Sequence, residues 1–121
     1  MSILRIVIVV SVCLALVGCH SASISATISN HRSTPVTLVE VDYPSASFGV
    51  QKLGPGEDFR YRFKVIGTGA TTLLWSEPAK RDQKTHGPVL REGDEGTLAI
   101  TFPADGPPTW EVRLHNKSLP R

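Results

Sequence analysis

Along most of this chain, apolar and polar residues alternate with a period of two, which is the pattern of β-strands that bury one face. In the clearest run, Phe59, Tyr61, Phe63 and Val65 share one side and charged residues the other. Seven short strands are predicted in this way, at 24–29, 36–43, 47–53, 58–65, 71–75, 97–102 and 110–115. Segments rich in Gly, Pro and Asn separate them, so we expect strands joined by turns.

Two segments depart from this simple alternation. Val36 and Leu38 fall on the face opposite Val39, which predicts a bulge or a switch of facing near Leu38. Residues 77–88 are mostly polar and are interrupted by proline and glycine. We therefore expect a loop or a weak edge strand in that segment.

The predicted fold class is all-β. No window of helical length carries apolar residues at the spacing of an amphipathic helix. Turns about every 8–12 residues are typical of a β-sandwich or small barrel. The turn at 53–57 (LGPGE) and the strand after it resemble the L-x-P-G-E turn and strand of bacterial immunoglobulin-like and fibronectin-like modules. This resemblance implies a single Ig-like β-sandwich of about seven antiparallel strands, although the Cys…Trp…Cys spacing of true immunoglobulin domains is missing.

The N-terminal segment has a different character. It carries one cation, Arg5, and then an apolar stretch at 6–18, shorter than the roughly 20 residues that a membrane-spanning helix needs. This order is typical of a signal peptide, which would form an N-terminal signal helix. A plain secretory signal would end in an Ala-x-Ala-like site, whereas this one ends in LVGC at 16–19.

The LVGC sequence resembles the lipobox of bacterial lipoproteins. The resemblance implies that signal peptidase recognises Leu16, Val17 and Gly18. It also implies that Cys19 accepts diacylglycerol and becomes the mature N-terminus. An uncleaved N-terminal helix and a plain secretory signal are the alternatives. We predict a lipoprotein signal peptide at 1–18, a lipidated cysteine and short tether at 19–23, a β-sandwich domain at 24–115 and a tail at 116–121.

The lipid on Cys19 would make the membrane the first partner of the exported domain, because two or three acyl chains hold a protein firmly. The next residue is His20, whereas an aspartate there resembles an inner-membrane retention signal in enteric bacteria. We therefore expect a lipid-anchored protein of the bacterial cell envelope, at the outer membrane in preference to the inner one.

Charge and cysteine content narrow the list of partners. Arg5 is the only charged residue in 1–18, so the exported part carries 12 Lys and Arg against 11 Asp and Glu. A nearly neutral domain has no large field to attract nucleic acid, and we expect no such partner. Cys13 leaves with the signal peptide, so only the lipidated Cys19 remains and no disulfide within the chain is expected.

The histidines form no recognisable metal motif. His20, His31, His86 and His115 lie far apart in the sequence. Lipidated Cys19 would be a thioether, and Met1 is removed, which excludes a His/Cys/Met copper site. Zinc would need three or four ligands brought together from separate loops.

Calcium is the other metal to consider. Glu92, Asp94 and Glu95 cluster in a turn flanked by glycines, and Asp105 lies in another loop. Their spacing is not that of a calcium loop, so we expect a solvated acidic turn. We predict no metal site and no cofactor.

Catalytic chemistry also lacks a motif. The chain has no G-x-S-x-G elbow and, once lipidated, no free cysteine. The candidate carboxylates for glycoside hydrolysis are Glu57, Glu77, Glu92 and Glu111, and their spacing does not indicate a catalytic pair. We predict that the protein is not an enzyme and has no catalytic residues.

Two surface features remain. Arg60, Arg62 and Lys64 form a basic stripe, which we interpret as a solvated face paired with neighbouring acids. Contact with anionic lipid headgroups or envelope polysaccharide is the alternative. Trp75 and Trp110 have apolar residues two positions away and are expected in the core.

The leading hypothesis is a membrane-anchored envelope lipoprotein with a non-catalytic β-sandwich that acts as a binding or structural module. Its partner would be an envelope protein or polysaccharide. An exported protein that binds a small molecule or Ca²⁺ is the second hypothesis, and a small envelope hydrolase is the third.

Overall fold

The computed structural model describes residues 21–116, which contain eight strands and no helix. The strands are β1 (Ile24–Asn30), β2 (Val36–Tyr43), β3 (Ala46–Leu53), β4 (Asp58–Phe63), β5 (Gly69–Ser76), β6 (Gln83–Leu90), β7 (Glu95–Phe102) and β8 (Thr109–His115). The predicted signal helix, its recognition residues at 16–18, and Cys19 lie outside the described residues.

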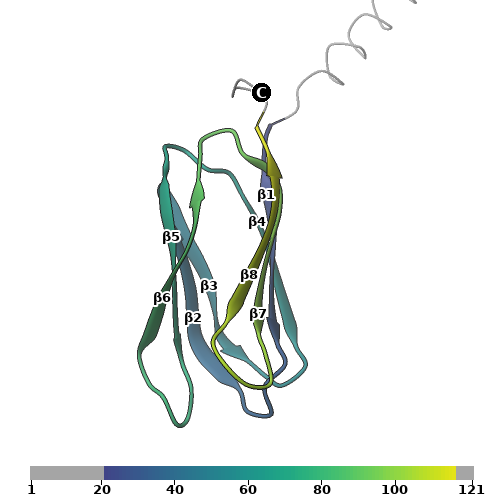
Figure 1. The fold of residues 1–121 in the computed structure, drawn as a ribbon, viewed down its shortest axis with the longest axis vertical. Coiled ribbons are helices and arrows are strands. Elements are labelled where there is room, and N and C mark those ends of the chain that lie inside the picture. Colours follow the sequence, from purple (N-terminus) through teal and green to yellow (C-terminus); the bar gives the residue numbers. More distant parts are fainter. Residues whose placement is uncertain (1–20, 117–121) are drawn as a thin grey trace, which may run out of the picture.

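The strands form two four-stranded sheets, in the orders β4-β1-β7-β8 and β3-β2-β5-β6, which face each other in a sandwich (Figure 1). This arrangement confirms the predicted all-β sandwich. All seven predicted strands are present. The eighth, β6, lies at a sheet edge within and just beyond the segment for which a loop or an edge strand was expected.

One pairing in the sandwich is parallel. β1 lies between β4 and β7, antiparallel to β4 but parallel to β7, with a register that runs from Ile24 opposite Gly96 to Asn30 opposite Phe102. The other pairs of neighbouring strands are antiparallel, as expected. Alternation shows which side of a strand is buried but not which strand lies beside it, so the parallel pair has no signature in the sequence.

The core lies between the sheets and is built largely from the predicted inward positions. Its buried hydrophobic residues are Ile24, Ala26, Ile28, Val36, Val39, Val41, Phe48, Leu53, Phe63, Val65, Leu73, Trp75, Leu90, Leu98, Ile100 and Phe102. Each fully buried Val, Leu, Ile or Phe contributes about 1.5–3 kcal/mol relative to an exposed one. Trp75 belongs to the core as expected, and its ring packs edge-on against Phe102 with centroids 5.5 Å apart.

Two aromatic residues lie at sheet edges and are only partly covered: Tyr61, predicted on the inward face of its strand, and Trp110, expected in the core. Tyr61 on β4 is 42% exposed and stacks on Phe48 of β3, with ring centroids 4.7 Å apart. Trp110 on β8 is only partly buried, and a Cβ built at Gly87 of β6 would come within 2.5 Å of its ring. An inward side chain on an edge strand has a neighbouring strand on one side only, so it stays partly exposed.

The two ends of the described chain lie at the same end of the sandwich (Figure 1). This N-terminal end holds the start of β1 and the end of β8. The opposite end, termed distal, carries the loops at 31–35, 54–57, 77–82 and 103–108. A chain that continues before residue 21 therefore leaves from the end opposite these four loops.

Candidate functional site

Leu38, in the middle of β2, is one of two non-glycine residues with positive φ in the described part of the chain. Thr37 lies opposite Ser76 of β5, and Glu40 lies opposite Leu74, so β2 contains one extra residue in this interval. This is a β-bulge, which confirms the irregularity predicted near Leu38. Leu38 has a φ of 50°, and its side chain is 63% exposed.

Core packing explains why β2 contains a bulge, but it does not explain why the bulged residue is a leucine. The extra residue lets Val36 and Val39, three positions apart, both point into the core. A left-handed backbone costs a bulky residue about 1–3 kcal/mol, whereas Gly and Asn adopt it more readily. Leu38 therefore combines a strained backbone with an exposed apolar side chain. Within the described domain, a glycine or an asparagine at this position would serve the packing of the core equally well.

Leu38 lines a groove of about 670 Å³ on the outer face of the sheet β3-β2-β5-β6. One row of groove residues crosses all four strands, in the order Gly49, Glu40, Leu74 and Lys84. Any side chain at position 49 would collide with the backbone of β2. The glycine therefore leaves this part of the face without a side chain.

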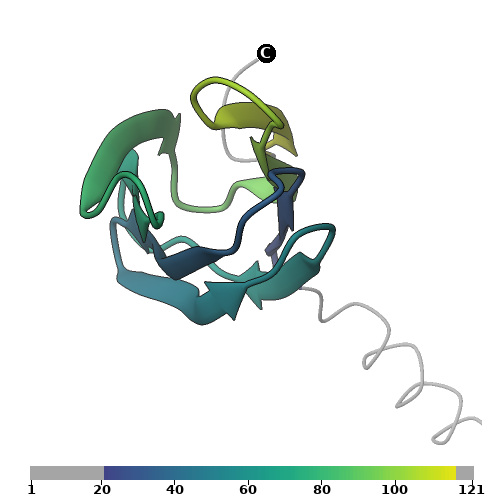
Figure 2. The same cartoon turned by 90° about the horizontal axis from the view of Figure 1, so that it is seen from below.

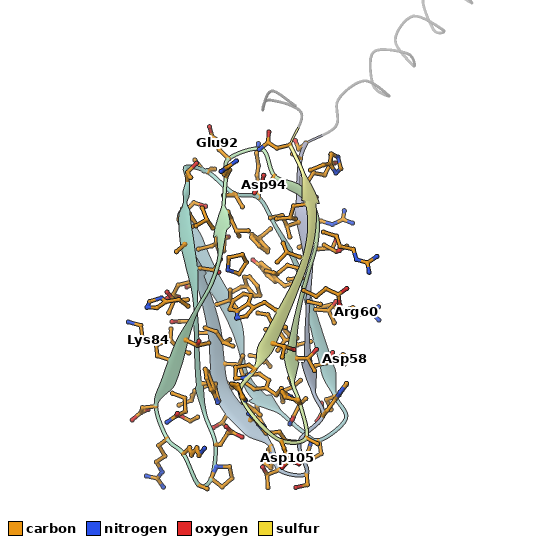
Figure 3. The ribbon with its side chains drawn as sticks, viewed as in Figure 1. Asp58, Arg60, Lys84, Glu92, Asp94 and Asp105 are labelled. Carbon is orange, nitrogen blue, oxygen red and sulfur yellow. The ribbon has the colours of Figure 1, made fainter. Side chains whose placement is uncertain are left out.

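The groove combines an apolar centre with charges at its rim. Leu38 and Leu74 supply apolar surface, and Glu40 and Lys84 lie on the two sides of Leu74. A hydrogen bond with Asp42 and the repulsion between the two carboxyl groups raise the pKa of Glu40. Figure 3 shows Lys84 pointing outward from β6. This surface can seat an apolar side chain and pair with charged groups on either side of it.

A second cleft, of about 610 Å³, lies at the distal end between the β5–β6 and β7–β8 loops. Its lining includes a half-buried ion pair in which Nε of Arg32 lies 2.6 Å from Oε1 of Glu77. Arg32 also donates to the backbone oxygens of Pro103 (2.8 Å) and Gly106 (2.9 Å). The indole N–H of Trp75 donates to the other oxygen of Glu77 (3.0 Å). These groups partner one another, so we assign them to the joining of the two sheets.

The acidic turn considered for calcium is tied into the fold by hydrogen bonds. Asp94 is 7% exposed and accepts hydrogen bonds from the backbone N–H of Arg91 (2.8 Å) and the side chain of Asn116 (3.0 Å). Asp105 lies at the distal end, far from Glu92 and Asp94 (Figure 3). The expectation of a solvated turn is wrong for Asp94, because its carboxylate closes the turn.

The described histidines stay apart from one another. His115 lies 3.1 Å from a carboxylate oxygen of Glu95, and Nδ1 of His86 lies 3.5 Å from the hydroxyl of Thr72. Within residues 21–116, no group of three His, Cys, Asp or Glu side chains could hold a metal ion. In the same part of the chain, no helix has the length and apolar character needed to cross a membrane.

The basic stripe lies on β4 and on Lys64, the residue after its end, and has small hydroxyl residues beside it. Arg60 lies opposite Thr27 of β1, and Arg62 lies opposite Ser25. Among the described residues, no ion pair joins Arg60, Arg62 or Lys64 to an acid. The expected pairing with neighbouring acids is therefore wrong for this stripe.

Sequence reasoning located the bulge but missed the groove. Leu74 takes an outward position on a strand that was considered for its inward residues alone, and Lys84 lies in the segment left open between a loop and an edge strand. The break in alternation at Leu38 was the available signal. It pointed to a backbone irregularity and not to a surface.

The fold places the protein in the class of two-sheet β-sandwiches, with a groove on the outer face of one sheet. In comparisons with known proteins, no family model, no curated protein and no solved structure matches the chain. The function is therefore inferred from the chain's own residues.

Proposed function

We propose that the chain is a bacterial lipoprotein held on the envelope membrane by lipid on Cys19, and that its β-sandwich is a non-catalytic module that binds a partner through the groove at Leu38. The LVGC sequence at 16–19, directly after an apolar stretch, supports the anchor. β1 begins at Ile24, five residues after Cys19. The anchor would therefore hold the sandwich close to the lipid surface.

Leu38 is the observation that carries the binding role. The strained backbone and the exposed apolar side chain of Leu38 both lower the stability of the free domain. A partner that buries this side chain would contribute a favourable free energy that compensates for this loss. An apolar centre flanked by Glu40 and Lys84 suits a protein segment that presents an apolar side chain between charged ones. We therefore propose an envelope protein as the partner, in preference to a polysaccharide.

Leu38→Asn is expected to stabilise the free domain while it weakens binding. Asparagine adopts the left-handed conformation more readily than leucine, so the free energy of unfolding should rise by about 1 kcal/mol in a denaturant titration. Val89→Asn, at another exposed apolar residue, is the matched control and should change stability by less than about 0.5 kcal/mol. A clear loss of stability in Leu38→Asn would show that the leucine supports the fold.

The groove can be tested as a binding surface in the producing cell. A photo-crosslinking residue placed at position 38 is expected to give one discrete protein adduct. The same residue at position 27, on the outer face of the other sheet, is the control and should not give that adduct. Identical adducts at both positions, or none at position 38, would contradict the proposed site.

A further inference from the structure

Four strand edges border the sandwich, those of β4 and β8 in one sheet and those of β3 and β6 in the other. The β3 and β4 edges are joined by the stacking of Phe48 on Tyr61. β6 contains Gly87 and Pro88 in an irregular part of its pairing, and proline lacks the N–H that an added strand would need. β8 is a regular strand of seven residues that is hydrogen-bonded to β7 alone (Figure 2). It meets β6 through the ring of Trp110, which packs against Gly87 on the inner side and leaves the backbone edge of β8 unpaired within the described residues.

The free backbone groups of β8 belong to Trp110, Val112 and Leu114. In β7, the N–H of Gly96 and the carbonyl of Phe102 point toward the β1 side, where both are hydrogen-bonded. Backbone direction alternates along a strand, so the odd-numbered residues of β7 bond to β8. Their partners there are the odd-numbered residues. The N–H and C=O groups of the even-numbered residues of β8 therefore point to the open edge.

This edge is complementary to a second copy of itself. In antiparallel pairing about Val112, each Trp110 faces Leu114 of the other copy and the two Val112 residues face each other. On the outer side of the sheet, Glu111 faces Arg113 of the other copy. Both of these side chains are well exposed in the single chain, where they form a local ion pair of 3.1 Å. Apolar residues thus meet apolar residues on the inner side, and opposite charges meet on the outer side.

We propose that two copies of this chain pair edge to edge through β8 in this register, which joins their sheets into one across a two-fold axis. Val112, 36% exposed in the single chain, would gain a partner. Moving the centre of pairing by one residue places Glu111 opposite Glu111, or Arg113 opposite Arg113. Self-pairing of β4 about Tyr61 would place Arg60 opposite Arg62. Charge therefore favours both this strand and this register.

The proposed dimer does not depend on the lipid anchor, but the two together fix the orientation of the sandwich on the membrane. Antiparallel pairing puts the two β1 starts at opposite ends of the dimer, and the five residues from Cys19 to Ile24 span at most about 18 Å. Both anchors reach one bilayer when the strands lie along its surface and the two-fold axis is normal to it. Anchoring raises the effective concentration of the two copies, so a small interface suffices.

Cysteine pairs test the register in the full chain in its own membrane. Glu111 and the opposing Arg113 would form a non-hydrogen-bonded pair with Cα atoms about 4.5 Å apart, a separation that a disulfide can bridge. Co-expressed chains with Glu111→Cys and Arg113→Cys are expected to form a covalent dimer on mild oxidation, seen on a non-reducing gel. Each variant alone, the parent chain and a Thr27→Cys chain are the controls and should stay largely monomeric. Mixed chains that cross-link no better than these controls would overturn the proposal.

Charge reversal gives a readout without thiols. Glu111→Arg or Arg113→Glu alone places like charges opposite each other, so the dissociation constant of the dimer should rise by on the order of tenfold or more. The double variant E111R/R113E restores opposite charges and should return to the parent value. Energy transfer between labelled copies measures the dimer fraction, and equal dimer fractions in single and double variants would overturn the proposal. Lipid labelling of Cys19 is scored separately, so a failed dimer is distinguished from a failed anchor.

Discussion

Cells that produce the Cys19→Ser chain are expected to show no lipid label on the protein, and the chain should keep its full precursor length. Serine offers no thiol to accept diacylglycerol, and the lipobox resemblance implies that cleavage follows lipidation. Each buried CH₂ contributes about 0.8 kcal/mol, so losing two or three acyl chains removes the lipid anchor and leaves only the uncleaved apolar stretch at 6–18 to associate with the membrane. Metabolic labelling with an alkyne fatty acid, followed by gel mobility and membrane fractionation, measures all three consequences.

The chain supplies its own matched control for this experiment. Cys13 lies within the apolar stretch and before the proposed cleavage point. Cys13→Ser should therefore take up label, mature and partition with membranes as the parent chain does. A Cys19→Ser chain that still matures and partitions normally would contradict the anchor. Loss of label in both variants, with the parent chain labelled, would contradict Cys19 as the sole determinant of lipidation.

Hydrophobic alternation was enough to predict most of the sandwich, because a two-sheet sandwich buries one face of every strand. β1 and β7 show this best, since their alternate positions are buried in the structure as the pattern predicts. The same pattern is weaker on edge strands, where Tyr61 and Trp110 face inward but remain partly exposed. β6 was uncertain for a related reason, because its middle carries polar residues, a glycine and a proline.

The sequence pattern does not indicate contacts between residues that lie far apart in the chain. Arg32 and Glu77 are 45 positions apart, and from the sequence each is an ordinary surface charge in a polar loop. Their pairing depends on two loops that meet only when the sheets pack. The groove depends likewise on register, which brings Gly49, Glu40 and Leu74 into one row. Sequence reasoning predicted the faces of strands, whereas the candidate site arises from the way strands are placed beside one another.

The Arg32–Glu77 pair provides the largest stability effect that we expect in the sandwich. Glu77→Ala should lower the free energy of unfolding by about 2–4 kcal/mol, because it leaves a half-buried guanidinium without its counter-charge. A domain of this size has roughly 5–15 kcal/mol in total, so the variant would lose a large part of its stability. The indole N–H of Trp75 also loses its acceptor. Chemical denaturation followed by tryptophan fluorescence measures the change.

Replacing both partners separates the cost of an unpaired, half-buried charge from the contribution of the pair. The double variant Arg32→Met, Glu77→Leu should recover most of the loss and come within about 1–2 kcal/mol of the parent, because neither charge remains to be solvated. Glu111→Ala is the surface control when the chain is studied at a concentration where it is monomeric, since it then breaks only the exposed pair with Arg113 and should cost less than about 1 kcal/mol. A double variant as unstable as Glu77→Ala would mean that the arginine holds the distal loops through its bonds to Pro103 and Gly106, and that the charge pair itself is secondary.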